Sequence, residues 1–287
     1  MTDNKVTVWR SLRVGRARLE QANIPNADFE ASLLFQHVTG WSREMLIERE
    51  GETVSAAIQS AFDALIVRRL AREPISAILG DVEFMGFRFV SDSRALTPRM
   101  DSERLVEAAL KNTKPGENGF VLDLGTGSGC LLLSFLLNRP GWRGVGVDAS
   151  ADAISLMEEN TKLHGLQGRA FSTLADWKQV GFHVEEADIV ISNPPYIRTK
   201  TLETLDPEVR NHDPMQALDG GEDGLDAYRE IAELCDQKMK PDALLFLEIG
   251  YDQGVTVTEL LNRYSFADVT VLKDYSGHNR VVKARSQ

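Results

Sequence analysis

The sequence predicts an α/β protein in which a mostly parallel sheet, covered by helices on both faces, follows a small helical domain. Within residues 1–80, apolar side chains recur at helical spacing. Residues 81–97 place three phenylalanines around a glycine, a pattern typical of a β-hairpin. From residue 101 onward, short apolar runs alternate with helical patterns, and this alternation is typical of parallel βα units.

The helical character of residues 1–80 is clearest in two segments. Their apolar positions are Leu33, Leu34 and Val38 in the first and Ile58, Phe62, Leu65, Ile66 and Leu70 in the second. Short breaks fall at residues 23–26, at Thr39-Gly40 and at Gly51. We therefore predict a helical domain over residues 1–80, followed by a β-hairpin linker over residues 81–100.

The remaining residues, 101–287, predict alternating strands and helices. The expected strands are residues 120–124, 145–147, 189–191, 244–249, 269–272 and 281–283, and the expected helices are residues 102–110, 130–137, 151–164, 225–238 and 255–262. Right-handed crossovers bring the carboxyl ends of parallel strands to one edge of the sheet, so we expect a ligand site at that edge.

The charge distribution argues against a nucleic-acid partner. The net charge is −11; residues 1–80 carry 10 basic and 10 acidic residues, and the rest of the chain carries 22 and 33. A protein that binds duplex DNA needs several cations along one face. The small arginine cluster at Arg10, Arg13, Arg16 and Arg18 is better explained as a solvated helix face. We expect no direct binding to nucleic acid.

The sequence also argues against a membrane or secreted protein. No apolar stretch approaches the roughly 20 residues that a membrane span requires, and the amino terminus lacks the apolar core of a signal peptide. Two cysteines, Cys130 and Cys235, provide neither a disulfide framework nor the spacing of metal ligands. We expect a cytoplasmic protein without a bound metal.

A glycine-rich turn follows the first expected strand of the sheet. Its residues are Gly125, Thr126, Gly127, Ser128 and Gly129. Such a turn lets the backbone approach a ligand, but alone it does not identify the ligand. The spacing is not the dinucleotide fingerprint, and no Gly-Lys-Ser/Thr follows, which excludes a P-loop. Asp123, just before the turn, would repel a pyrophosphate but can accept hydrogen bonds from the α-ammonium of an amino acid.

Two further acidic positions suit an adenosine. Asp148 ends the next strand, where a carboxylate can accept both ribose hydroxyls. Asp176 and Trp177 follow, a carboxylate for the exocyclic amine of adenine and an indole for its face. Asp148 could instead only help to start the helix after it, and a lone tryptophan is more often a core residue. Together these residues fit S-adenosylmethionine better than NAD.

The strand at residues 189–191 ends at Asn193-Pro194-Pro195-Tyr196. Each proline fixes φ and removes an N–H, so the carbonyl of Pro194 points in a set direction. The side-chain oxygen of Asn193 adds a second neutral acceptor. Two acceptors can hold both hydrogens of a planar NH2 group, and the ring of Tyr196 can pack on the flat face of that group.

This arrangement suits methylation of a conjugated nitrogen. Holding both N–H bonds orients the nitrogen lone pair, and the same acceptors stabilise the positive charge that develops on it. No strong general base is required before transfer. The alternative, a purely structural Pro-Pro turn, leaves the nearby glycine-rich turn unexplained.

The sequence resembles a known family, both in these two motifs and in further stretches. The glycine-rich turn, the strand-end aspartate and N-P-P-Y resemble a class I methyltransferase acting on planar nitrogens. Further stretches resemble the peptide chain release factor glutamine methyltransferases, the HemK/PrmC family: R-E-P-I-S-A-I-L-G (72–80), L-T-P-R-M-D-S-E (96–103), D-P-M-Q-A-L-D-G-G-E-D-G-L-D-A-Y-R (213–229), L-E-I-G-Y-D-Q-G (247–254) and K-D-Y-S-G-H-N-R-V-V (273–282). The resemblance extends from about residue 30 to the end.

The resemblance implies a Rossmann-like class I methyltransferase domain over residues 101–287, with a mostly parallel seven-stranded sheet. It also implies that the glutamine of the Gly-Gly-Gln loop of class I release factors is methylated on its side-chain nitrogen, with S-adenosyl-L-homocysteine as the second product. The implied cofactor residues are Asp123, Gly125 to Gly129, Asp148, Asp176, Trp177 and Asn193. The implied substrate residues are Asn193, Pro194, Pro195 and Tyr196, of which Asn193, Pro194 and Tyr196 are catalytic.

We expect the neutral domain of residues 1–80 to dock the protein substrate, and the enzyme to be a monomer. The chain departs from the family pattern at three positions outside N-P-P-Y: Ala77 replaces a usual tyrosine, Met100 a proline and Asp213 a glutamate. These departures concern the shape of the hairpin and of the substrate entrance.

Three alternatives stay open. A nucleic-acid amino methyltransferase would share the N-P-P-Y site, but it needs a basic channel or a recognition domain. A glutamine methyltransferase for a ribosomal protein would differ mainly in its amino-terminal region. A non-enzymatic adaptor on a degenerate methyltransferase fold would be expected to have a damaged cofactor loop, whereas here the glycines, Asp148 and Asn193 are all present.

Overall fold

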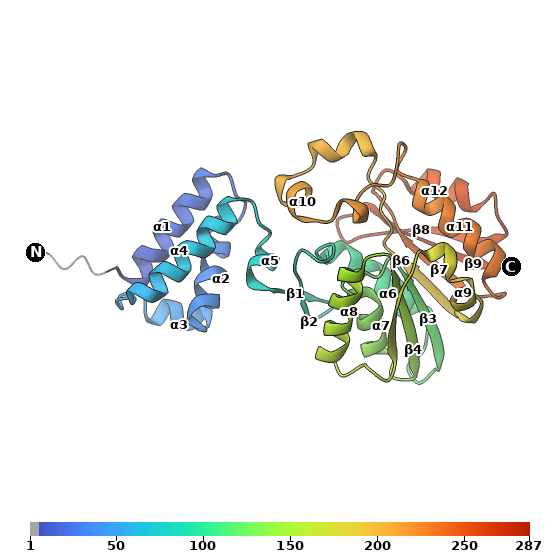
Figure 1. The fold of residues 1–287 in the computed structure, drawn as a ribbon, viewed down its shortest axis with the longest axis horizontal. Helices are drawn as coiled ribbons and strands as arrows, with labels where there is room; N and C mark the ends of the chain where they lie inside the picture. The colour runs from blue at the N-terminus through green and yellow to red at the C-terminus, as the bar shows by residue number, and fades with distance from the viewer. Residues whose placement is uncertain (1–5) are drawn as a thin grey trace, which may run out of the picture. The chain divides into compact units, whose positions relative to one another are not determined.

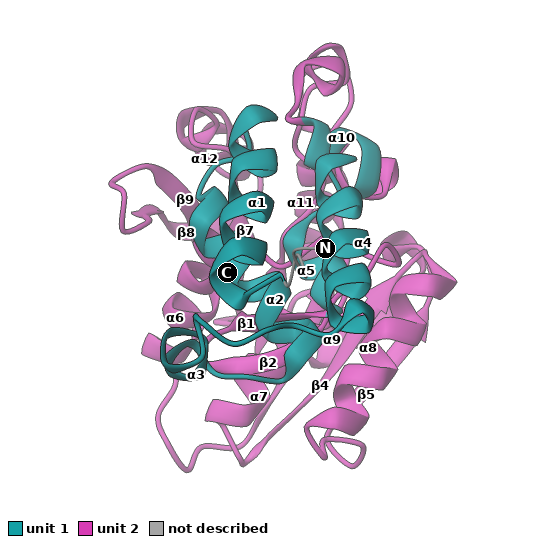
Figure 2. Ribbon diagram, turned by 90° about the vertical axis from the view of Figure 1, so that its left-hand side faces the viewer, with its two compact units in different colours: residues 1–80, 207–212 teal, residues 81–206, 213–287 magenta. Residues whose placement is uncertain are grey.

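The computed structural model describes residues 6–287, which form two compact units (Figure 2). Unit 1 contains the described residues up to 80 together with residues 207–212, and unit 2 contains residues 81–206 and 213–287. Residues 1–5 lie outside the described residues. They belong to the expected helical domain and to the amino terminus in which no signal peptide was expected.

The described part of unit 1 is built from helices, apart from an isolated β-bridge between Thr7 and Thr53. Its helices are α1 (Val8–Gln21), α2 (Ala27–Thr39), α3 (Arg43–Glu48), α4 (Ala56–Leu70), α5 (Ile75–Leu79) and α10 (Pro207–His212). Side-chain oxygens of Thr7, Ser42 and Ser55 cap the amino ends of α1, α3 and α4. Phe35 and Phe62 meet edge to face in the core, with ring centroids 5.1 Å apart. The predicted helical character of this part of the chain is confirmed.

A buried arginine joins α10 to the other helices of unit 1. The side chain of Arg69 is 5% exposed and pairs with Glu30 at 2.6 Å and Glu208 at 3.0 Å. Arg72 also pairs with Glu208, at 3.1 Å. Because a buried charge is stable only when it is paired and hydrogen-bonded, these contacts hold a segment from far along the sequence within the helical unit.

Unit 2 begins with the expected hairpin. Strands β1 (Asp81–Phe84) and β2 (Phe87–Val90) are antiparallel. The two residues between them, Met85 and Gly86, have φ of 54° and 77°, as in the tight turns that match the twist of a hairpin.

The main sheet of unit 2 has seven strands in the order β5-β4-β3-β6-β7-β9-β8 (Figure 1). They are β3 (Gly119–Leu124), β4 (Trp142–Asp148), β5 (Ala170–Leu174), β6 (Ile189–Ser192), β7 (Leu244–Glu248), β8 (Phe266–Lys273) and β9 (Asn279–Ser286). The first five in this order are parallel, and β9 is antiparallel to both of its neighbours. This confirms the predicted mostly parallel sheet; β5 is the strand that the apolar pattern did not predict.

Helices cover both faces of this sheet, as expected. One face packs on α6 (Glu103–Lys111), α7 (Cys130–Asn138) and α8 (Ala151–Leu163), and the other on α9 (Gly181–Glu186), α11 (Asp226–Lys238) and α12 (Gly254–Leu261). Successive side chains of β3 alternate between them: Val121 belongs to the first core and Leu122 to the second. Because β3, β4 and β6 are parallel neighbours, their carboxyl ends lie along one edge of the sheet.

Candidate active site

A cavity of about 240 Å³ lies at this edge and is lined only by residues of unit 2. The predicted site residues that line it are Gly125, Thr126, Gly127, Ser128, Asp148, Asp176, Trp177, Asn193 and Pro195. Asp123, Gly129, Pro194 and Tyr196 are not among the lining residues. The structure thus brings the turn after β3, the end of β4, the loop after β5 and the end of β6 around one space.

The glycine-rich turn has the backbone that its sequence requires. Gly125, Gly127 and Gly129 have φ of 73°, 54° and 80°, a region that other residues adopt only with strain. The N–H groups of Gly125 and Thr126 both donate to the carbonyl of Val147 at 2.9 Å. The turn is consequently anchored to β4 and leaves glycine surface facing the cavity.

Asp148 supports this turn and the following helix. Its Oδ2 accepts a hydrogen bond from the N–H of Gly127 at 2.9 Å, and its Oδ1 accepts one from the N–H of Ser150, also at 2.9 Å. The hydroxyl of Ser150 caps α8. Asp148 therefore helps to start the helix, as the structural alternative expected, and also lines the cavity. Each carboxylate oxygen keeps a lone pair for a ligand hydroxyl.

Asp123 lies beneath the turn and is fully buried. Its Oδ2 accepts a hydrogen bond from the hydroxyl of Thr126 at 2.7 Å, and its Oδ1 has no hydrogen-bond partner. Burial raises the pKa of Asp123 to about 7, and the negative charge of Asp148 acts in the same direction. An unpartnered buried oxygen beside the glycine-rich turn fits a positively charged ligand group, whose charge would lower this pKa again.

The loop after β5 contributes an aromatic wall. Trp177 begins the short helix η2 (Trp177–Gln179), packs against the core and also lines the cavity. Its Nε1 donates to Oε2 of Glu230 at 2.9 Å, which fixes the ring. Asp176 uses Oδ1 to accept from the N–H of Lys178 at 2.9 Å and is otherwise exposed. Glu230, from α11, also lines the cavity and was not predicted.

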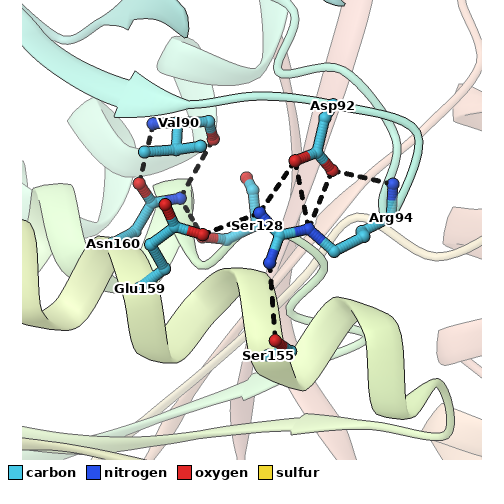
Figure 3. A network of polar contacts seen from close by, with 7 residues as sticks. All are labelled: Val90, Asp92, Arg94, Ser128, Ser155, Glu159 and Asn160. Atoms are coloured by element: carbon cyan, nitrogen blue, oxygen red, sulfur yellow. Dashed lines mark hydrogen bonds and ion pairs between the residues drawn. The ribbon is translucent and has the colours of Figure 1, made fainter. Parts of the chain in front are cut away.

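A buried amide ties the turn to the hairpin (Figure 3). Asn160 on α8 is 0% exposed; its Oδ1 accepts from the N–H of Val90, and its Nδ2 donates to the carbonyls of Val90 and Ser128. Arg94 adds ion pairs to Asp92 and Glu159, each at 2.7 Å. The linker after β2 is thus fixed to α8, which also holds the glycine-rich turn through the hydrogen bond from Asn160 to Ser128.

The Asn193–Tyr196 turn follows β6, the neighbour of β3, and contributes Asn193 and Pro195 to the same cavity. Nδ2 of Asn193 donates to the hydroxyl of Ser102 at 3.4 Å, and both residues line the cavity. Pro194 is buried, whereas Pro195 reaches the cavity. Because Ser102 occupies the nitrogen of the amide, the oxygen is the part of Asn193 that is available to a ligand.

Gln253 and Tyr228, from two of the motifs that resemble the family, form hydrogen bonds next to Tyr196. The carbonyl of Tyr196 accepts a hydrogen bond from Nε2 of Gln253 at 3.1 Å. Oε1 of Gln253 accepts from the N–H of Gly250 at 2.9 Å, and the hydroxyl of Tyr228 donates to the carbonyl of Glu248 at 2.9 Å. Burial raises the pKa of the Tyr196 phenol, so this group stays protonated. These hydrogen bonds hold the carboxyl end of the turn in place.

The segment from Leu96 to Arg99 forms part of the wall that sequence reasoning did not assign to the site. Asp213 holds it: its Oδ1 accepts from the N–H of Thr97 at 3.3 Å, and its Oδ2 from Nη2 of Arg99 at 2.8 Å. Burial raises the pKa of Asp213 although Arg99 opposes the rise. The departure at Asp213 thus falls on a residue that shapes the cavity, whereas Met100 is 78% exposed. The L-T-P-R and D-P-M-Q motifs were the sequence signal for this wall.

No helix within residues 6–287 is long and apolar enough to cross a membrane. No group of three or more histidine, cysteine, aspartate or glutamate side chains in the same range is arranged to hold a metal ion.

Known proteins resemble this chain along nearly its whole length. Residues 11–80 match the model of the PrmC N-terminal domain, and residues 100–206 match that of the methyltransferase small domain. The hMettl16 catalytic domain, solved in complex with the MAT2A 3'UTR hairpin 6, is 15% identical; it covers 70% of this chain and 76% of its own, with a TM-score of 0.56, and so supports the fold alone.

Two relatives are similar enough to define the family. The release factor glutamine methyltransferase of Caulobacter vibrioides is 38% identical over 98% of this chain and 96% of its own. The enzyme of the same name from Agrobacterium fabrum is 38% identical over 97% of each chain. At this identity and coverage, the protein belongs to the family of release factor glutamine methyltransferases.

Proposed function

We propose that this protein uses S-adenosylmethionine to methylate the side-chain amide nitrogen of the glutamine in the Gly-Gly-Gln loop of class I peptide chain release factors. Family membership supports this activity. The structural observation that carries it is that Asn193 and Pro195 line the same cavity as the glycine-rich turn. Cofactor and amide groups therefore have adjoining sites.

The residues around the turn fit S-adenosylmethionine. Gly125 and Gly127 leave room for close approach, Asp148 offers acceptors for the ribose, and Trp177 offers an aromatic face for the adenine. Asp123 offers its unpartnered oxygen for the ammonium of the methionine part. When bound, S-adenosylmethionine supplies an electrophilic methyl group, and S-adenosylhomocysteine remains after transfer.

The turn after β6 would hold the glutamine. Oδ1 of Asn193 and the carbonyl of Pro194 accept the two N–H bonds of the planar amide, and Tyr196 packs near its flat face. These acceptors fix the direction of the nitrogen lone pair and stabilise the positive charge that forms on the nitrogen. Because they are neutral and held rigidly, they need no reorganisation during the reaction.

The helical unit would dock the rest of the release factor. In this proposal the enzyme works as a monomer in the cytoplasm, where translation termination takes place, and it makes no direct contact with nucleic acid. The net charge of −11 and the balanced charge of residues 1–80 agree with a protein substrate.

Mass spectrometry tests the proposal directly. Purified class I release factor is incubated with the protein and isotope-labelled S-adenosylmethionine and then digested. We expect one labelled methyl group on the glutamine of Gly-Gly-Gln, and far slower labelling when Asn193→Ala replaces the wild-type protein. A ribosomal protein fraction and total RNA are assayed in parallel. Label in either of these, with unlabelled release factor, would refute the assignment.

A further inference from the structure

A buried carboxylate lies directly behind the Asn193–Tyr196 turn. Glu248, at the end of β7, is 2% exposed, and its Oε2 has no hydrogen-bond partner. Burial raises the pKa of this carboxylate, while the nearby hydroxyls of Ser102 and Tyr196 and the charge of Arg280 oppose the rise. Burying a carboxylate that is only partly satisfied is costly, and the roles assigned above to the site residues do not account for it.

Ser102 lies close to this carboxylate and also contacts Asn193. A serine hydroxyl has a single hydrogen. When that hydrogen is donated to ionised Glu248, the oxygen of Ser102 can only accept, and it accepts from Nδ2 of Asn193 at 3.4 Å. The orientation of an asparagine amide is set by such partners. The nitrogen of Asn193 therefore faces Ser102, and its oxygen is left for the cavity.

We propose that Glu248 and Ser102 are positioning residues that keep the amide oxygen of Asn193 directed at the substrate. This inference rests on the proposed role of Asn193 in holding the glutamine amide. An ionised carboxylate accepts hydrogen bonds and cannot donate them, so it gives the chain Asn193–Ser102–Glu248 one direction. A neutral group at position 248 can donate to Ser102, which then donates to Asn193, and the asparagine turns an N–H toward the N–H of the substrate.

The proposal predicts a pH dependence, because a protonated carboxyl can also donate. Burial raises the pKa of Glu248 to about 7; hydrogen bonds from Ser102 and Tyr196 and the charge of Arg280 oppose the rise, while Asp101 adds to it. Tyr228 and Cys130 are the other titratable groups facing Glu248, and burial raises both of their pKa values. We expect kcat to fall as the pH falls through about 7.

The stability of the protein should respond to the same group in the opposite direction. The folded pKa of Glu248 lies above its ordinary value of 4.5, so the folded state binds the proton more tightly between pH 4.5 and about 7. Stability therefore falls as the pH rises through this window. Asp123 has a pKa raised to about 7 as well, but it lies at the cofactor turn, so kcat is measured at saturating S-adenosylmethionine.

The test uses Glu248→Gln in the full-length protein, with Glu233→Gln, an exposed glutamate on α11, as the control. We expect Glu248→Gln to bind S-adenosylmethionine within about threefold of wild type in calorimetry. Its kcat on release factor should fall on the order of 10²-fold, the scale of losing one preorganised group, and the acidic limb of its pH profile should disappear. Glu248→Asp should recover part of the rate. A folded Glu248→Gln protein with wild-type kcat, or with the limb unchanged, overturns the proposal.

Ser102 provides a second, independent variant if Glu248→Gln does not fold. Ser102→Ala should lower kcat with little change in cofactor affinity, and Ser102→Thr, which keeps the hydroxyl, should restore it. Wild-type kcat in Ser102→Ala would overturn the proposed relay, meaning the chain Asn193–Ser102–Glu248. Asn193→Ala is measured beside both: if it keeps wild-type turnover, the proposed role of Asn193 itself has failed. Loss in Asn193→Ala together with wild-type rates in the Ser102 and Glu248 variants rejects only the relay.

Discussion

Asp148 and Gly127 are joined by a 2.9 Å hydrogen bond from the glycine N–H to Oδ2, so the carboxylate predicted to hold the ribose also fixes the glycine-rich turn. Asp148→Ala should weaken S-adenosylmethionine binding by about 2–4 kcal/mol, the scale of losing charge-assisted hydrogen bonds. This corresponds to roughly 30- to 1,000-fold in Kd. Calorimetry measures it, with the exposed neighbour Asp152→Ala as control. Wild-type affinity in a folded Asp148→Ala protein would remove Asp148 from the cofactor site.

Asn193 allows a sharper distinction between two substitutions. Asn193→Ala removes one acceptor and should lower turnover by about 10²-fold or more, with little change in cofactor affinity. Asn193→Asp keeps the size of the side chain and retains acceptors, so it should keep partial activity. Steady-state kinetics on purified release factor compare the two. Equal rates for the Ala and Asp variants would contradict the model of two acceptors.

Asn160 should be important for stability. Asn160→Ala leaves the N–H and carbonyl of Val90 and the carbonyl of Ser128 without this partner, at about 1–3 kcal/mol for each buried group left unsatisfied. Urea denaturation should show a loss of several kcal/mol. Glu159→Ala, the adjacent residue with an exposed ion pair to Arg94, should cost less than about 1 kcal/mol. Similar losses of stability in the two variants would show that the buried hydrogen bonds of Asn160 add no more stability than an exposed ion pair.

Arg68 and Arg69 form a natural pair for comparing exposed and buried charges. Arg69→Ala leaves Glu30 and Glu208 without their buried partner and should cost about 3–5 kcal/mol. Arg68, whose side chain is 43% exposed, pairs with Glu73 at the surface, so Arg68→Ala should cost at most about 1 kcal/mol. Thermal and urea denaturation of the two variants provide the comparison, and a reversed order would exclude the buried network as a source of stability.

The docking role of the helical unit is tested with two substrates. An enzyme beginning at residue 81 should still bind S-adenosylmethionine, because the cavity is lined only by residues of unit 2. It should methylate intact release factor poorly. On a short peptide containing Gly-Gly-Gln, full-length and shortened enzymes should differ much less. Equal turnover of both enzymes on intact release factor would argue against docking.

The elements that the sequence predicted are those whose signal is local. β3 and β6 contain the apolar runs 120–122 and 189–191, since both of their faces are buried. β5 was missed because it is an edge strand: Phe171 and Leu174 are 49% and 57% exposed, and polar Ser172 and Thr173 lie between them. A strand with little burial leaves little pattern in the sequence.

The same reasoning explains which site residues were found. Asp148 ends β4 and Asn193 directly follows β6, so their place at the sheet edge could be inferred from chain order. Ser102 and Glu230 reach the cavity, and Asp213 holds part of its wall, from segments whose approach depends on tertiary packing. The pairing of Arg69 with Glu208, 139 residues apart, likewise has no local signature.

Because α10 belongs to unit 1, the chain passes between the two units three times, after residues 80, 206 and 212. The helical unit is therefore not an interchangeable amino-terminal module. A chimaera can take residues 1–80 from one relative and the rest from another. Arg69 and its partner Glu30 then come from one parent and α10 from the other. Where the foreign segment lacks a carboxylate at position 208, Arg69 loses a partner inside the core. Grafts that carry both segments from the same parent should fold better than those that exchange residues 1–80 alone.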